Sequence, residues 1–251
     1  MLRTRTAILA ATAAVVLVPL AAAAPRQHLA SPSLRVLAPA TGQVVTGNSI
    51  STKIAVQNWM INGMLAGKAN RNGIGHYHIH LDGVLVNAYG SPRASISLQN
   101  VKPGKHTLTF VLAEDNHMEL AKTAKNVSFV YRPAKPLPTI KPAKLGKPSI
   151  RIVSPTNGAV VSGMFPLKVA VKNFHLSAAL FGKPDVAGWG HWHVFLDKPS
   201  MTTMLAMTAK QTAMISLQGV KPGKHTIIAM LADDFHAPVP GTMSKVTITV
   251  R

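Results

Sequence analysis

Histidine is the residue type whose number and spacing in this 251-residue sequence best suit chemistry. Eight of the 11 histidines form four pairs at matched positions in the two halves of the chain: His76 and His191, His78 and His193, His106 and His225, and His117 and His236. Neutral imidazole is the commonest side-chain ligand for metal ions in proteins. The repetition therefore indicates two related histidine sites, one in each half of the chain.

The first two pairs form a His-x-His motif inside a predicted β-strand. Successive side chains of a strand point to opposite faces, so His76 and His78 share one face while Tyr77 lies on the other. The apolar face is expected to meet a core. The two imidazoles then project outward, with Cβ atoms about 7 Å apart. This spacing allows both to bind one metal ion, and His191 and His193 repeat it.

A third ligand is predicted from the order of the strands. If the His-x-His strand is the third of an immunoglobulin-like sandwich, the strand at 107–113 is the sixth, and these two are antiparallel neighbours. The residue that follows the end of the sixth strand then lies beside the His-x-His motif. Three imidazoles suit copper, zinc or nickel better than calcium or magnesium. We therefore predict two metal sites, with copper preferred and zinc as the alternative: His76, His78 and His117 in the first, and His191, His193 and His236 in the second.

Further polar residues near these positions have expected supporting roles. Asp82 and Asp197 end the His-x-His strands and are predicted to orient the metal ligands through hydrogen bonds. His106 and His225 follow Pro-Gly turns, where many sandwich domains carry a tyrosine that fixes a corner, and we interpret both as structural. The alternative for the His-x-His motifs is that they are solvated histidines on a basic strand.

Methionine gives a second indication of metal chemistry. Met201, Met204, Met207 and Met214 lie close together in the second half, without a matched cluster in the first. Thioether sulfur is a soft ligand that suits Cu(I). Methionine also fills hydrophobic cores, which is its commoner role.

The motifs of common enzyme classes are absent from the sequence. The chain has no cysteine, so it offers no thiol nucleophile, thiolate metal site or disulfide. It has no Gly-x-Ser-x-Gly elbow. The segment Gly73-Ile-Gly75 lacks the third glycine and the following helix of a dinucleotide-binding loop. We therefore predict a protein that is not an enzyme, with a hydrolase as the remaining catalytic alternative.

The elements that position the histidines come from an internal repeat. Residues 33–132 match residues 149–251 along their whole length, and Ser33-Leu-Arg-Val-Leu-Ala-Pro39 returns as Ser149-Ile-Arg-Ile-Val-Ser-Pro155. Each copy has about seven short segments separated by turns, as in an immunoglobulin-like sandwich. The sequence predicts an all-β protein of two tandem immunoglobulin-like β-sandwich domains, with brief helical turns within 58–69 and 173–182.

Three segments lie outside the repeats. Residues 133–148 are rich in proline and lysine, which favours an extended polyproline II linker between separate domains. Residues 1–23 have a basic start, an apolar run and a small-residue end, as in a secretory signal peptide, and residues 24–32 form a tail. A retained anchor helix is the alternative. We predict a secreted or periplasmic protein of the cell envelope, with no membrane span after cleavage.

The formal net charge of +19 favours polyanionic partners. The basic residues are mostly isolated lysines and aromatic residues make up 5% of the chain, so we expect no specific nucleic-acid partner. The alternative function is a non-catalytic cell-envelope module that binds anionic polymers or a protein partner.

A family resemblance depends on the same residues. Gly75-His-Tyr-His78, then Pro103-Gly-Lys-His-Thr107, then an acidic residue and His117, resembles a bacterial family called domain of unknown function 4399, which occurs in exported proteins. The resemblance covers each whole copy and is closer in the second. The family has a third histidine where Tyr77 stands and another near Leu120, so these departures argue against a four-histidine site. The resemblance implies export but no activity.

Overall fold

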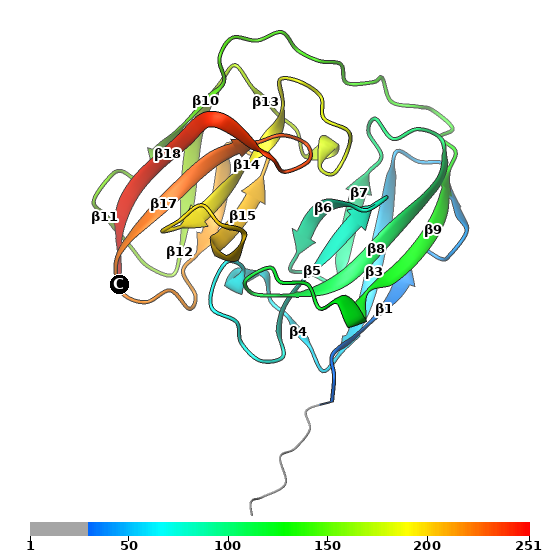
Figure 1. The fold of residues 1–251 in the computed structure, drawn as a ribbon, viewed down its shortest axis with the longest axis horizontal. Helices are drawn as coiled ribbons and strands as arrows, with labels where there is room; N and C mark the ends of the chain where they lie inside the picture. Colours follow the sequence, from blue (N-terminus) through cyan, green and yellow to red (C-terminus); the bar gives the residue numbers. More distant parts are fainter. Residues whose placement is uncertain (1–29) are drawn as a thin grey trace, which may run out of the picture. The chain divides into compact units, whose positions relative to one another are not determined.

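The computed structural model of the chain describes residues 30–251, and most of this part is β-strand (Figure 1). The predicted signal peptide and most of the predicted tail lie outside the described residues. Within the described part, the helices are short 3-10 turns, and none is long and apolar enough to cross a membrane. The all-β class predicted from the sequence is confirmed.

The first repeat forms two sheets. The smaller has the order β1-β3-β7, and the larger has the order β2-β9-β8-β5-β4, with β6 paired to β5. The elements are β1 (Ser33–Ala38), β2 (Gln43–Val45), β3 (Ser49–Gln57), β4 (Met60–Ile61), η1 (Gly63–Leu65), β5 (Ile74–Leu81), β6 (Val84–Tyr89), β7 (Arg93–Ser97), β8 (Gly104–Glu114), η2 (Ala121–Thr123) and β9 (Lys125–Tyr131).

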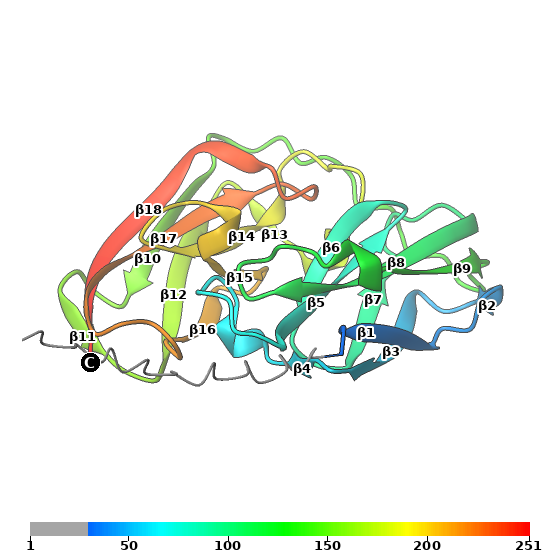
Figure 2. The same ribbon diagram turned by 60° about the horizontal axis from the view of Figure 1, so that its bottom comes forward.

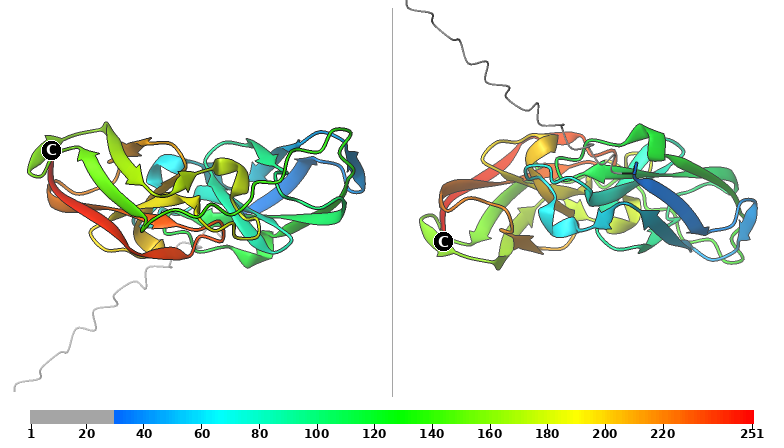
Figure 3. Two further views of the ribbon diagram at one scale, coloured as in Figure 1. Left: turned by 90° about the horizontal axis from the view of Figure 1, so that it is seen from above. Right: turned by 90° about the horizontal axis from the view of Figure 1, so that it is seen from below.

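The second repeat has the same topology. Its sheets have the orders β10-β12-β16 and β11-β18-β17-β14-β13, with β15 paired to β14. The elements are β10 (Ser149–Ser154), β11 (Ala159–Val161), β12 (Met164–Lys172), β13 (His175–Leu176), η3 (Ala178–Leu180), β14 (Trp189–Leu196), η4 (Met201–Thr203), β15 (Met204–Thr208), β16 (Thr212–Ser216), β17 (Gly223–Ala232) and β18 (Pro238–Val250). The two sheets of each repeat form the layers of an immunoglobulin-like sandwich, which can be followed in Figures 2 and 3.

Each repeat has its own hydrophobic core between its two sheets. In β5 the inward side chains are Tyr77, Ile79 and Leu81, and all three are buried in the core. Trp192 takes the place of Tyr77 in the second core. Fully burying one such large apolar side chain contributes about 1.5–3 kcal/mol. The predicted alternation is thereby confirmed, and it leaves the histidines on the other face of the same strand.

The proline-rich segment 133–148 is extended but not free. The side chain of Asn100 donates to the carbonyl oxygen of Ile140 at 3.0 Å and accepts from the Ile140 N–H at 2.9 Å. Trp189 Nε1 of the second repeat donates to the carbonyl oxygen of Lys141 at 3.2 Å. Residues Ser31–Arg251 form one compact unit. The linker is therefore held against both repeats, where the sequence suggested a spacer between separate bodies.

Candidate metal centre

The three predicted histidines of the first repeat converge in space. β5 pairs with β8 in antiparallel register from Gly75 opposite Glu114 to Leu81 opposite Leu108, as the predicted strand order requires. His117 follows the end of β8 and therefore reaches the start of β5. His76 Nε2 lies 3.1 Å from His78 Nε2 and 3.0 Å from His117 Nδ1. This set of three residues is called the first triad.

The second repeat brings its histidines together in the same way. His191 Nε2 lies 2.9 Å from His193 Nε2 and 2.9 Å from His236 Nδ1. These three residues form the second triad. In both triads the ligand atoms lie within 4.8 Å of one another, close enough to hold one metal ion. The six residues predicted from the sequence thus form two compact clusters of three.

Tight turns place the third histidine of each triad. His117 N–H donates to the Glu114 carbonyl oxygen at 2.9 Å, and His236 N–H donates to that of Asp233 at 3.1 Å. Both histidines have φ of 68°, in the left-handed region that non-glycine residues rarely adopt. A left-handed conformation at a matched histidine in both repeats is a local cost of the kind that accumulates at functional sites.

The triads are buried, so the alternative of solvated histidines is wrong. His76 is 1% exposed and His193 is 5% exposed. Burial lowers the pKa of His76 to about 2, of His117 to about 4 and of His193 to about 3, because a charged imidazolium is costly away from water. The neighbouring imidazoles lower these pKa values further. His76, His117 and His193 are therefore neutral near pH 7, and each has a lone pair that can bind a metal.

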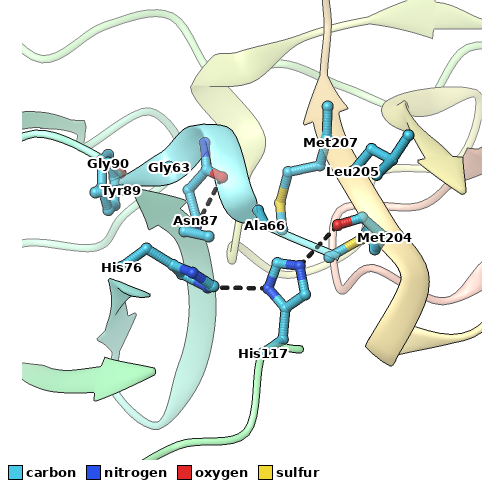
Figure 4. Close-up of a pocket in the computed structure, with 12 residues that line it drawn as sticks. Gly63, Ala66, His76, Asn87, Tyr89, Gly90, His117, Met204, Leu205 and Met207 are labelled. Carbon is cyan, nitrogen blue, oxygen red and sulfur yellow. Dashed lines mark hydrogen bonds between the residues drawn. The ribbon is translucent and has the colours of Figure 1, made fainter. Parts of the chain in front are cut away.

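A backbone carbonyl fixes the tautomer of the third histidine in each triad. His117 Nε2 lies 2.7 Å from the carbonyl oxygen of Met204, a contact drawn as a dashed line in Figure 4. His236 Nε2 lies 2.8 Å from the carbonyl oxygen of Leu85. A carbonyl oxygen accepts only, so Nε2–H donates in both cases and Nδ1 presents its lone pair to the triad. Each carbonyl belongs to the other repeat. This outer hydrogen bond is typical of metal-binding histidines.

A carboxylate accepts the outer hydrogen bond of His78. Glu119 Oε1 lies 2.7 Å from His78 Nδ1 and 2.7 Å from His80 Nε2. The hydrogen bonds from both imidazoles hold the pKa of Glu119 near 2, so the group is ionised and accepts from His78 Nδ1–H. In the neutral imidazole, a proton on Nδ1 leaves Nε2 with the lone pair that faces the triad.

The first histidine of each triad has an unsatisfied nitrogen. Among the described residues, neither His76 Nδ1 nor His191 Nδ1 has a hydrogen-bond partner, although both are buried. His76 Nε2 faces two lone pairs and carries at most one proton, so one repulsive lone-pair contact remains in the neutral triad. A cation between the three nitrogens removes that conflict. The arrangement is therefore suited to a metal ion.

Glycines allow the two repeats to approach at the same carbonyl groups. A Cβ atom on Gly67 would lie 2.5 Å from the Met204 oxygen, and one on Gly182 would lie 2.6 Å from the Leu85 oxygen. Both distances are far below van der Waals contact, so a larger residue at either position would displace the carbonyl. The glycines thus preserve the outer hydrogen bonds of the triads.

The predicted role of Asp82 and Asp197 is wrong. Asp82 lies at the far end of β5 from His76, where its carboxylate accepts from His106 Nδ1 at 2.7 Å and from the Thr107 N–H at 2.8 Å. Asp197 makes the matching bonds to His225 and Thr226. His106 and His225 are thus corner residues, as predicted.

Sequence reasoning missed the groups that orient the ligands. For Glu119 the sequence does contain a signal, because this acidic residue lies two positions after the predicted ligand His117. In the structure Glu119 forms a β-bridge with Ala113 beside the triad. His80, which shares the face of His76 and His78 by strand alternation, contacts the same carboxylate. The carbonyls of Leu85 and Met204 have no sequence signal, because any residue supplies one.

Comparisons with known proteins concern the fold. No family model and no curated protein matches the chain. The fibronectin(III)-like modules of CbhA from Clostridium thermocellum are 12% identical, over 87% of this chain and 94% of that chain, with a TM-score of 0.29. A tetra-tandem repeat of a large adhesion protein is 10% identical, over 87% and 48%, with a TM-score of 0.26. The chain spans less than half the length of this adhesion structure. The resemblance to domain of unknown function 4399 stays a prediction.

Proposed function

We propose that this protein is an exported metal-binding protein, with one three-histidine site for copper or zinc in each repeat. The observation that carries the proposal is the convergence of lone pairs. In the first triad, outer acceptors fix two of three buried nitrogens as lone pairs, and these nitrogens lie 3.0–3.1 Å from the third. The second triad repeats the distances and the carbonyl acceptor.

The donor set favours a transition metal. Imidazole nitrogens suit copper and zinc, whereas calcium and magnesium take oxygen ligands. Three nitrogens each about 2.0 Å from a tetrahedral ion lie about 3.3 Å from one another, so a small expansion of the triad admits the ion. A cavity of about 210 Å³ borders His76 and His117 and leaves room for a further ligand.

Export is supported by the sequence pattern at the N-terminus. The competing function is a non-catalytic envelope module that binds anionic polymers, and the net charge of +19 favours it. The two functions differ in what they require. Polymer binding would weaken steeply with salt and be indifferent to chelators, whereas metal binding depends on the triads.

Isothermal titration of the metal-stripped protein with Cu(II) and Zn(II) tests the proposal. We expect two equivalents to bind tightly. The variants His76→Ala/His78→Ala and His191→Ala/His193→Ala should each bind one, since each removes two ligands of one triad. The variant His106→Ala/His225→Ala is the control, because it removes two histidines that belong to neither triad. Unchanged stoichiometry in the triad variants would contradict the proposal.

A further inference from the structure

The surroundings of His193 differ from those of its counterpart His78. β14 lies between β15 and β17, and the register places Met207 opposite His193 on one side and Met230 opposite it on the other. Directly opposed residues share a face, with Cβ atoms about 4.5–5.5 Å apart. The outer face of the second repeat therefore carries a Met-His-Met row across three strands.

The first repeat has no sulfur at these positions. Ala88 and Val111 stand opposite His78 in the matching register. Neither side chain can bind a metal ion. The two triads thus have the same three imidazoles, but only the second has thioethers as immediate neighbours within its own sheet.

The two repeats also differ in whether a carboxylate lies beside the triad. His80 and Glu119 contact each other beside the first triad. The registers place Phe195 at the position of His80 and Pro238 at the position of Glu119. The first triad therefore has an adjacent negative charge, and the second has apolar groups and sulfur in its place.

A cavity joins the thioethers to the second triad. A cavity of about 200 Å³ is lined by His193 and His236 together with Met201, Met204, Met207 and Met230. Met207 also lines the cavity beside His117, where Figure 4 shows its side chain with that of Met204. Met204 is 1% exposed and packs with Phe195 and Ile228, so we assign it a packing role.

Met207 and Met230 lie on the outer face of the sheet, away from the core that Trp192 and Val194 occupy. Both pack against the small cluster of Phe195, Met204 and Ile228 but are only partly buried, so each side chain also borders the cavity. The same cavity is also lined by the imidazoles of His193 and His236. Soft thioether and imidazole ligands together favour Cu(I) over divalent ions.

We propose that the second triad is a Cu(I) site in which Met207 and Met230 supply thioether ligands beside His193. The proposal rests on the proposed function, since it requires that the triads bind metal. The first triad has the negatively charged Glu119 carboxylate beside His78, and it therefore prefers a divalent ion. The duplication has therefore produced two sites with different preferences for the charge of the ion.

The test uses the full chain with Met207→Leu/Met230→Leu, substitutions that keep side-chain volume but remove sulfur. The control is Met164→Leu/Met214→Leu, which changes two exposed methionines in the other sheet of the same repeat. Cu(I) affinity is measured without oxygen by competition with a chromogenic chelator, and copper–sulfur scattering by X-ray absorption. Zn(II) stoichiometry reports whether both triads remain intact.

We expect Met207→Leu/Met230→Leu to weaken the tightest Cu(I) binding by on the order of tenfold or more and to abolish copper–sulfur scattering. Zn(II) stoichiometry should stay at two equivalents. The reciprocal variant Ala88→Met/Val111→Met should strengthen Cu(I) binding at the first triad. Unchanged Cu(I) affinity, or nitrogen scattering alone in the parent, would overturn the thioether site while leaving the proposed function in place. A parent chain that binds none of these ions would overturn both.

Discussion

His236 Nε2 donates to the carbonyl oxygen of Leu85 at 2.8 Å, although 151 positions separate the two residues. His117 makes the reciprocal bond to Met204 at 2.7 Å. Leu85 and Met204 occupy matching positions, next to β5 and β14 respectively. Each repeat therefore supplies the group that orients a histidine of the other repeat, so neither triad is complete within one copy. This dependence gives a physical reason for two copies in one compact chain.

Gly182 tests the contact between the repeats. Gly182→Ala places a Cβ atom 2.6 Å from the Leu85 oxygen, so the carbonyl must move away from His236. We expect weaker metal binding at the second triad, by about 10–100-fold as for other outer hydrogen bonds, and a lower melting temperature. Titration calorimetry and thermal unfolding measure both.

Gly83→Ala is the matched control for that change. Gly83 also has a positive φ, of 86°, but a Cβ atom there meets nothing within 4 Å. Both variants strain the backbone, whereas only Gly182→Ala displaces the carbonyl. Equal loss of metal affinity in the two variants would refute the orienting role of Leu85.

Glu119 is expected to affect the first triad alone. Glu119→Gln removes the carboxylate that accepts from His78 Nδ1–H and weakens the basicity of His78 Nε2. Metal affinity at the first triad should fall by about 10–100-fold, while the second triad, which has Pro238 at this position, should be unaffected. Titrations in the His191→Ala/His193→Ala and His76→Ala/His78→Ala backgrounds separate the two sites. Loss at the second triad would contradict the assignment.

The features of the site that depend on strand periodicity could be predicted from the sequence. Alternation placed Tyr77 inward and His76 and His78 outward, and strand order brought His117 beside them. It did not reveal their burial, because the groups that cover them come from the other repeat and follow no local pattern. The role predicted for Asp82 was wrong for a related reason. It was inferred from the position of Asp82 next to the His-x-His strand, without considering which end of the strand the ligands occupy. Its position at the opposite end of the strand instead brings it to His106.

Asn100 is predicted to hold the linker against the first repeat. Asn100→Gly keeps the left-handed backbone, with φ of 57°, and copies Gly219 of the second repeat, but it removes two hydrogen bonds to Ile140. Each such bond contributes about 0.5–1.5 kcal/mol. Limited digestion with trypsin should cleave faster after Lys144, the lysine of the linker that proline does not follow. Cleavage at the parent rate would show that Asn100 does not restrain the linker.

The metal-free protein is expected to lose stability as the pH falls from about 6.5 to 5. Burial lowers the pKa of His76 to about 2, of His117 to about 4 and of His193 to about 3, so the unfolded chain binds protons in this window that the folded chain does not. Burial acts in the opposite direction on three aspartates, raising the pKa of Asp115 to about 6, that of Asp234 to about 7 and also that of Asp185.

The histidine effect is the larger, because the pKa values of His191 and His236 are lowered as well, so that five histidines outnumber the three aspartates. Urea unfolding of the metal-free protein at intervals from pH 7 to pH 5 measures the change. The variant Asp115→Asn/Asp234→Asn should show a steeper loss of stability than the parent, since two of the three opposing aspartates are gone. A free energy of unfolding that stays constant or rises toward pH 5 in this variant would mean that the triads are not held neutral by burial.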